Sequence, residues 1–205
     1  MKHLALTLGA MLFMSGFVPA AIAQVKTPIR GLVSMGAFRF VSNGGDPVNT
    51  LQPLNEKPGI FGGIVIVATW RELQPSANSG IPENNTIDRA LKEVRAYNSR
   101  NPEKPLAVKL RVWAGFEAPD WVKGLGGGPI ATMYKGKHRV LGHFWTVPYR
   151  NSWARFQKLL AGRYDSEPLI HEVAVTSCMS YTAEPFFLPT NEPSVVRPLT
   201  QAGFK

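Results

Sequence analysis

A carboxylate, Glu184, follows a segment that the sequence predicts to be a buried strand. The segment, Leu169–Leu188, begins with the apolar residues Ile170 and Val173 and then passes through small and hydroxyl side chains. Pro185 directly follows the carboxylate, and proline cannot continue a ladder of strand hydrogen bonds. Parallel α/β enzymes present charged groups to a cleft in this way, at the carboxyl ends of buried strands. We therefore predict that Glu184 is a catalytic acid or base; the alternative is a solvated loop residue.

Aromatic and charged side chains also follow the other predicted strands. Pyranose rings stack their apolar faces on aromatic rings, and their hydroxyl groups need charged or amide partners. A rim of tryptophans and carboxylates at successive strand ends therefore predicts a carbohydrate site, whereas the alternative for each tryptophan is packing in the core. The predicted sugar contacts are Trp70, Arg111, Trp113, Glu117, His143, Trp145 and Tyr181.

Alternating strands and helices must position these residues. Continuous β-branched runs such as Ile64-Val65-Ile66-Val67 predict strands covered on both faces, as in a parallel sheet. The predicted strands are Gly31–Phe40, Gly59–Thr69, Leu106–Val112 and the segment that starts at Leu169. The predicted helices run from a cap at Asn85 or Thr86 to Asn101, and from Ser152 to Arg163. This alternation predicts βαβ units and an α/β fold with a parallel sheet.

Two stretches are predicted to lack regular structure. The Gly-rich segment Lys123–Tyr149 predicts a long functional loop. It contains the closest basic cluster of the chain, formed by Lys135, Lys137, His138 and Arg139. The second stretch is the Pro-rich segment around Asn191-Glu192-Pro193. No predicted strand directly precedes this segment, so we do not predict Glu192 to be catalytic.

The composition is that of a globular protein, with 44% hydrophobic residues among 205 and a net charge of +9. The basic residues are scattered, without a run of five and without a base-stacking motif, so we predict no nucleic-acid partner. The sequence also lacks the usual dinucleotide, P-loop, zinc-protease and serine-hydrolase motifs. We therefore predict no cofactor and no metal ion.

The N-terminal residues have the pattern of a secretory signal peptide. Lys2 and His3 precede an apolar core, and Ala21-Ile22-Ala23 offers a cleavage site with small residues. A membrane anchor is the alternative, but the apolar run is interrupted and short for a span. We predict a secreted or periplasmic protein of residues 24–205 with no membrane association after cleavage. Its single cysteine, Cys178, excludes an internal disulfide and is predicted to be a small buried residue.

Several short motifs follow one another in a defined order along Gly59–Leu188. They are Trp70…Leu73-Gln74-Pro75, Ile87-Asp88-Arg89-Ala90-Leu91, Trp113-Ala114-Gly115-Phe116-Glu117-Ala118-Pro119-Asp120-Trp121-Val122, Phe144-Trp145, Trp153-Ala154-Arg155-Phe156, Arg163-Tyr164-Asp165 and Ala183-Glu184-Pro185. Their order and spacing resemble the N-terminal half of glycoside hydrolases of the large (β/α)8-barrel clan, closest to the β-galactosidase-like families.

The resemblance implies a partial (β/α)8 TIM barrel that carries a retaining glycosidase site. In that clan the acid/base glutamate follows the fourth strand within Asn-Glu-Pro, and Glu184-Pro185 matches this position. Ala183 replaces the asparagine that normally contacts the sugar 2-hydroxyl, which puts that contact in doubt. The resemblance makes Glu72 and Glu117, on the same rim, substrate-positioning groups.

The resemblance places the nucleophile after the seventh strand, whereas four strands are predicted here. A complete barrel takes about 250 residues, so the pattern predicts an N-terminal half-barrel. Its open sheet edges favour self-association. The alternatives are a partner that supplies the missing half, a non-catalytic periplasmic carbohydrate-binding protein, and an α/β scaffold without a sugar role.

Overall fold

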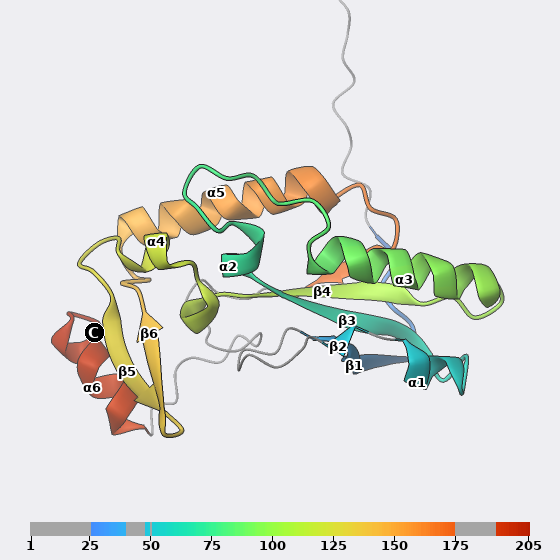
Figure 1. The fold of residues 1–205 in the computed structure, drawn as a ribbon, viewed down its shortest axis with the longest axis horizontal. Coiled ribbons are helices and arrows are strands. Elements are labelled where there is room, and N and C mark those ends of the chain that lie inside the picture. The colour runs from blue at the N-terminus through green and yellow to red at the C-terminus, as the bar shows by residue number, and fades with distance from the viewer. Residues whose placement is uncertain (1–25, 40–47, 50, 175–191) are drawn as a thin grey trace, which may run out of the picture.

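The computed structural model describes residues 26–39, 48–49, 51–174 and 192–205 (Figure 1). Its main sheet has the order β2-β1-β3-β4-β7. The four parallel strands are β1 (Leu32–Arg39), β3 (Phe61–Thr69), β4 (Ala107–Trp113) and β7 (Ile170–Val173). The short strand β2 (Val48–Asn49) pairs with β1 in the antiparallel direction. The predicted α/β fold with a parallel sheet is confirmed.

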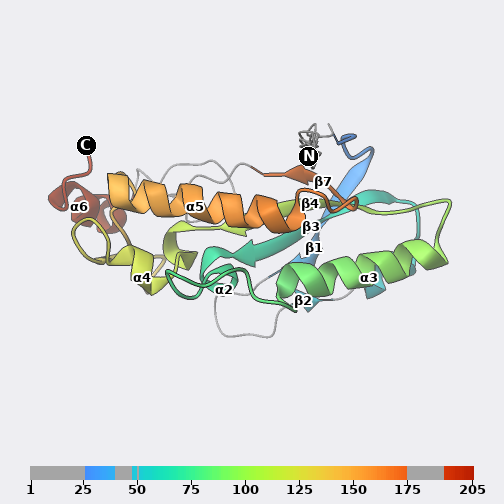
Figure 2. The same cartoon turned by 90° about the horizontal axis from the view of Figure 1, so that it is seen from above.

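The parallel strands lie side by side in the same order as they occur in the chain. Two long helices connect them, α3 (Thr86–Arg100) between β3 and β4, and α5 (Val147–Tyr164) between β4 and β7. Both helices lie on one face of the sheet, as the two perpendicular views show (Figures 1 and 2). Successive strands are therefore added in one direction across the sheet, and the carboxyl ends of the parallel strands lie at one edge.

The burial patterns explain why these segments form the sheet. In β3, the run Ile64-Val65-Ile66-Val67 is buried at every position, as predicted for a strand covered on both faces. In β4 burial alternates, because Val108, Leu110 and Val112 are buried while the residues between them are partly exposed. The intervening side chains Lys109, Arg111 and Trp113 therefore lie on the opposite face from the core helices.

Helix α3 begins and ends where the sequence predicts. The Asn85 side chain accepts hydrogen bonds from the backbone N–H groups of Ile87 and Asp88, which satisfies two free donors of the first turn. The helix buries Ile87, Ala90, Leu91, Val94 and Tyr97 on one face and ends at Asn101. Its stability therefore comes from capping and from one apolar stripe.

The predicted loop Lys123–Tyr149 is wrong in large part, because it contains a β-hairpin. Strands β5 (Ile130–Tyr134) and β6 (Lys137–Leu141) pair around a two-residue turn of Lys135 and Gly136, both with positive φ. This turn matches the right-handed twist of the flanking strands. Helix α5 begins at Val147, earlier than the predicted Ser152. Pro148 does not prevent this start, because proline is tolerated in the first turn of a helix. The glycines of the segment obscured these short elements.

The Pro-rich segment after Asn191 is a helix rather than the predicted loop. Helix α6 (Pro193–Gln201) has Pro193 in its first turn and buries Val195 and Leu199. It packs on β5, and the following Phe204 contacts the rings of Phe144 and Trp145. The remaining short helices are α1 (Gln52–Asn55), α2 (Trp70–Leu73), η1 (Gly115–Glu117) and α4 (Asp120–Lys123).

A buried hydroxyl joins the end of α5 to the start of α3. The Tyr164 hydroxyl donates a hydrogen bond to Asp88 Oδ1 at 2.8 Å and accepts one from Asn85 Nδ2 at 2.8 Å. We expect Tyr164→Phe to lower the free energy of unfolding by about 1–2 kcal/mol, because it removes the hydrogen bonds to Asp88 Oδ1 and from Asn85 Nδ2 in a buried site. Urea unfolding at pH 7 measures the loss, and an unchanged midpoint would contradict it.

The same hydroxyl gives the fold a dependence on alkaline pH. Burial raises the pKa of Tyr164 to about 12, so the folded chain holds this proton more tightly than the unfolded chain does. Its contribution to stability is complete below the unfolded pKa of about 10 and is lost as the pH rises towards 12. As the pH rises from about 10 to about 12, the free energy of unfolding should therefore fall less in Tyr164→Phe than in the parent chain.

Candidate functional site

A buried carboxylate and a cation meet at the carboxyl ends of β3 and β4. Arg71 lies in α2, directly after β3, and Glu117 lies in η1, just beyond β4. Arg71 Nη2 is 4.0 Å from Glu117 Oε2, and the Glu117 side chain is 7% exposed whereas that of Arg71 is 48% exposed. A carboxylate buried to this degree requires charged partners, and Arg71 supplies one from the helix that follows the neighbouring strand.

Two cations converge on one backbone carbonyl beside this pair. The Phe116 carbonyl accepts hydrogen bonds from Arg71 Nη2 at 2.9 Å and from Lys123 Nζ at 3.0 Å. Lys123 Nζ also lies 3.3 Å from Asp120 Oδ1. Burial of the ammonium, and secondly the positive charge of Arg71, lower the pKa of Lys123. The rim therefore holds two cations that donate to the same backbone carbonyl.

Arg71, Phe116, Asp120 and Lys123 line a cleft of about 590 Å³, within the size range of small-molecule sites. The hairpin β5–β6 forms its other wall and lies beyond the strand ends of the main sheet (Figure 1). Nine residues line the cleft: Arg71, Phe116, Asp120, Lys123, Gly124, Pro129, His138, Arg139 and Val140. It is thus built by three segments that are distant in sequence.

The sheet face opposite the core helices carries a second polar group. Lys109 Nζ is 3.0 Å from Glu172 Oε2, and Glu172 Oε1 accepts a hydrogen bond from the backbone of Ile29. These two contacts lower the pKa of Glu172. Further along β4, Arg111 and Trp113 lie on the same face, at positions that alternate with the buried core residues. The predicted contacts Arg111 and Trp113 are therefore brought close together, on the strand that leads to Glu117.

Trp113 also has an unused donor. Its Nε1 atom is buried and has no hydrogen-bond acceptor among the residues that the structure describes. A buried indole N–H normally has a partner. The side chain lies at the carboxyl end of β4, where Trp113 pairs in register with Thr69 of β3.

Trp70 lies in the core instead of at an open sugar site. The residue is 0% exposed, and its ring contacts four other aromatic rings. Its Nε1 atom donates a hydrogen bond to Gln74 Oε1 at 3.0 Å, so the polar atom of the indole is satisfied internally. Trp70 therefore packs in the core, which is the alternative that the sequence offered to a sugar contact.

His143 and Trp145 pack together near the C-terminal segment. Their ring centroids are 5.0 Å apart, and His143 Nδ1 is 2.9 Å from the Gly128 carbonyl. Trp145 also contacts Phe204, which follows α6. Neither residue lines the cleft beside Glu117. The structure therefore groups these two predicted contacts with each other and apart from Arg71 and Glu117.

The second rim carboxylate, Glu72, has a structural role. Its Oε1 atom accepts hydrogen bonds from the backbone N–H of Thr86 at 2.8 Å and from the Thr86 hydroxyl at 2.6 Å. It therefore satisfies donors at the start of α3, a position where negative charge is favourable.

The two remaining predicted site residues, Glu184 and Tyr181, lie outside the described residues, as does Cys178. The Asn191-Glu192-Pro193 motif is described from Glu192 onward. Glu192 is the N-cap of α6, and its backbone carbonyl accepts hydrogen bonds from Val195 and Val196. Its side chain makes no capping hydrogen bond. Glu192 thus marks a helix start.

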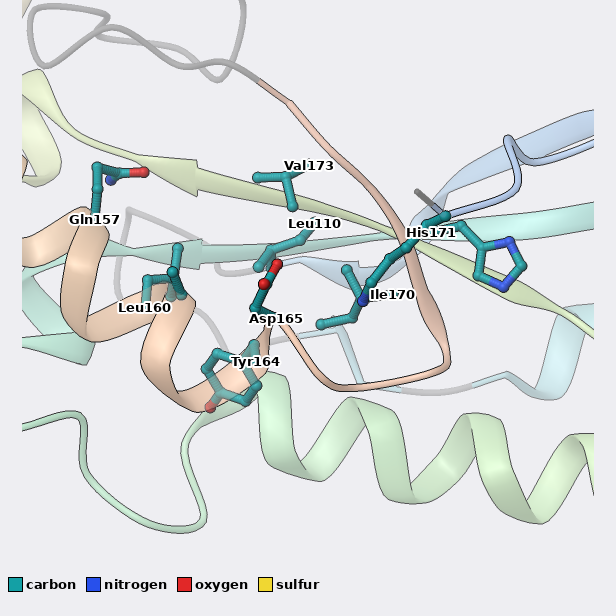
Figure 3. Close-up of a pocket in the computed structure, with 10 residues that line it drawn as sticks. Leu110, Gln157, Leu160, Tyr164, Asp165, Ile170, His171 and Val173 are labelled. Atoms are coloured by element: carbon teal, nitrogen blue, oxygen red, sulfur yellow. The ribbon is translucent and has the colours of Figure 1, made fainter. Parts of the chain in front are cut away.

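A second, mainly apolar pocket lies between α5 and the edge of the sheet (Figure 3). Leu160 on α5 and Leu110, Ile170 and Val173 on the strands form its apolar lining, and the Val173 side is open because that residue is 55% exposed. The pocket lies between a helix and the sheet. It therefore belongs to the packing of the fold rather than to the rim that carries Glu117.

The sequence reasoning missed Lys123, and it noted Arg139 only as a basic loop residue. Arg71 and Lys123 are far apart in the chain, so no local pattern signals that they share one carbonyl. For the hairpin, the one local signal is Gly136 between two short segments, and Lys135 is not one of the residues that usually precede glycine in such a turn.

Among the residues that the structure describes, no group of three or more histidine, cysteine or acidic side chains is arranged to hold a metal ion. In the same residues, every helix is too short or too polar to cross a bilayer. Comparisons of the chain with protein-family models, with curated proteins and with solved structures find no match.

Proposed function

We propose that the chain is an exported glycoside hydrolase of the (β/α)8-barrel clan, acting with retention and using Glu184 as the general acid/base. The strand order supports the barrel, because β1, β3, β4 and β7 are parallel, sequential neighbours with α3 and α5 on one face. A sheet wound in this way is the pattern of successive (β/α) units. In this proposal the described sheet supplies the first four barrel strands.

The observation that carries the proposal is the buried Glu117 held by Arg71 at the carboxyl ends of neighbouring strands. Barrel enzymes build their sites at this end of the sheet, from residues that follow different strands. Trp113 is the last residue of β4, shortly before Glu117 in the chain, and its buried indole N–H has no acceptor among the described residues. The pair and the indole form a rim that suits hydroxyl groups and the apolar face of a sugar.

In the proposed mechanism, Glu184 donates a proton to the glycosidic oxygen as the bond to the anomeric carbon breaks. A second carboxylate attacks that carbon, and Glu184 later removes a proton from the water that releases the sugar. Glu117 forms a pair with Arg71, and Glu72 caps α3, so both are assigned to positioning and structure. The nucleophile is assigned to the later strands that the family resemblance implies.

Two matched variants test the role of Glu184 on aryl glycosides, in a protein that also carries the later strands to which the nucleophile is assigned. We expect Glu184→Gln to reduce turnover by about a hundredfold or more, because the amide cannot donate the proton that assists leaving-group departure. Glu192→Gln changes the glutamate of the Asn-Glu-Pro motif and should retain turnover, since the Glu192 side chain makes no capping bond. Equal turnover in Glu184→Gln and the parent chain would overturn the assignment.

A non-catalytic carbohydrate-binding protein is the second candidate. It is favoured by the state of the two rim carboxylates in the described chain, since Glu117 is paired with a cation and Glu72 caps a helix. A retaining site needs two carboxyl groups about 5–5.5 Å apart. Saccharide quenching of tryptophan fluorescence without turnover by the parent chain would select this candidate.

A further inference from the structure

The cleft beside Glu117 has an excess of positive charge. Three of its lining residues, Arg71, Lys123 and Arg139, are cationic, and Asp120 is the one carboxylate among its lining residues. That carboxylate belongs to a side chain that is 89% exposed, so water screens its charge effectively. The cleft therefore presents a positive potential to a ligand.

Arg71 and Lys123 are held close together, and a bound anion would relieve the repulsion between their positive charges. Arg71 and Lys123 both donate to the Phe116 carbonyl, at 2.9 and 3.0 Å, so their charges lie within a few ångströms of each other. Like charges at this separation repel, particularly where one is buried. Glu117 compensates Arg71 and Asp120 pairs with Lys123, but about half of the Arg71 side chain remains exposed, and Arg71 lines the cleft. An anionic group bound there would gain from both cations.

The third cation lies on the opposite wall. Arg139 in β6 lies over the ring of Phe116, with its guanidinium carbon 5.9 Å from the ring centroid. The hairpin therefore brings a guanidinium to the same residue whose carbonyl binds the other two cations. Guanidinium groups bind carboxylates and sulfates through two parallel hydrogen bonds, which favours planar or tetrahedral oxyanions.

We infer that this cleft binds the anionic group of an acidic saccharide, either a uronate carboxylate or a sulfate ester. The saccharide part of the inference rests on the proposed function, whereas the anionic part rests on Arg71, Lys123 and Arg139. Nucleic acid is the less favoured polyanion, because Phe116 is buried and has Arg139 over its ring, which leaves it unsuited to base stacking.

Calorimetric binding to the full chain tests the inference with three saccharides of equal size. The probes are tri-galacturonate, a sulfated galactan trimer and neutral galactotriose. We expect at least one acidic trimer to bind about tenfold more tightly than the neutral trimer, with an advantage that falls as salt rises. The acidic trimer that binds more tightly shows whether the preferred anionic group is a uronate carboxylate or a sulfate ester.

Substitutions of the cationic residues test which side chains bind the anionic group. Arg71→Gln and Arg139→Gln should each lower affinity for the preferred acidic trimer about tenfold while changing that for galactotriose less than twofold. Lys137→Gln is the matched control, because it removes the same charge from the same hairpin at an exposed position outside the cleft. Arg139→Gln leaves the Arg71–Glu117 pair intact and so covers the case in which Arg71→Gln disturbs the fold.

Three results would overturn the inference. Equal binding of acidic and neutral trimers removes the anion preference but leaves the proposed carbohydrate function standing. Binding of none of the trimers removes both together. Tighter binding of a single-stranded oligonucleotide than of either acidic trimer would assign the cleft to nucleic acid instead.

Discussion

Gly62→Ala should lower the free energy of unfolding by more than about 3 kcal/mol, which is a large part of the stability of an ordinary domain. A Cβ atom at this position would lie 1.8 Å from the carbonyl oxygen of Arg30, far inside any allowed contact. The clash is with backbone, so no side-chain rotation relieves it. The chain can accommodate the methyl group only by separating β3 from the segment that leads into β1.

The local pairing explains why a glycine is needed there. Leu32 pairs with Phe61 and Val33 pairs with Gly63, so Gly62 is the extra residue of a bulge between β1 and β3. Glycine commonly marks such positions, where another backbone approaches closely. β1 is the first parallel strand of the sheet, and loss of this contact would expose the buried run of β3.

Gly162→Ala is the matched control for this prediction. Gly162 lies in α5, and nothing lies within 4 Å of its Cβ position. Alanine is favoured over glycine within a helix, so we expect a gain of about 0.5–1 kcal/mol. Thermal and urea unfolding of the two variants measure both effects. Similar midpoints for the two variants would show that the Arg30 contact does not constrain the fold.

Trp70→Ala should cost about 3–5 kcal/mol, because it removes the largest fully buried side chain of the core. The Trp70 ring packs edge-on against Trp121 and Tyr149 at centroid distances of 6.1 and 5.8 Å, and is stacked on Phe156 at 5.4 Å. These contacts tie α2 to α4 and α5, so truncation leaves a cavity among rigid rings. Because a loss of this size threatens folding itself, a milder variant accompanies Trp70→Ala.

Trp70→Phe keeps an aromatic ring and loses the hydrogen bond from Nε1 to Gln74. We expect a cost smaller than that of Trp70→Ala, and unchanged saccharide affinity in the folded fraction. Urea unfolding measures the stability of the sample, and calorimetry measures its saccharide affinity. A loss of saccharide affinity without a loss of stability would return Trp70 to the predicted sugar contacts and contradict its assignment to the core.

Local patterns in the sequence determined much of the sheet and its covering helices. The buried β-branched run of β3 and the Asn85 cap of α3 were predictable because each depends on residues that are close in the chain. The alternation of these segments was also sufficient to predict parallel pairing. The hairpin β5–β6 was predicted poorly, because its strands are short and its glycines suggest a loop.

The candidate site was less predictable than the fold. Glu117 was identified from its place after a strand, but the sequence assigned Trp70 the same kind of role, and the structure buries Trp70 in the core. Tryptophan serves equally well as core packing or as a sugar platform, so its residue type alone does not decide between them. Glu72 was likewise placed on the rim, and its hydrogen bonds to Thr86 show that it caps α3.

The sequence by itself determined the α/β class, the parallel strands with the helices α3 and α5 that connect them, and the position of Glu117 beyond β4. Only the tertiary structure decided that Arg71 and Lys123 meet at the Phe116 carbonyl and that the hairpin brings Arg139 to the same cleft. The physical reason is that periodicity and capping are local, whereas the convergence of charges depends on packing between segments distant in the chain.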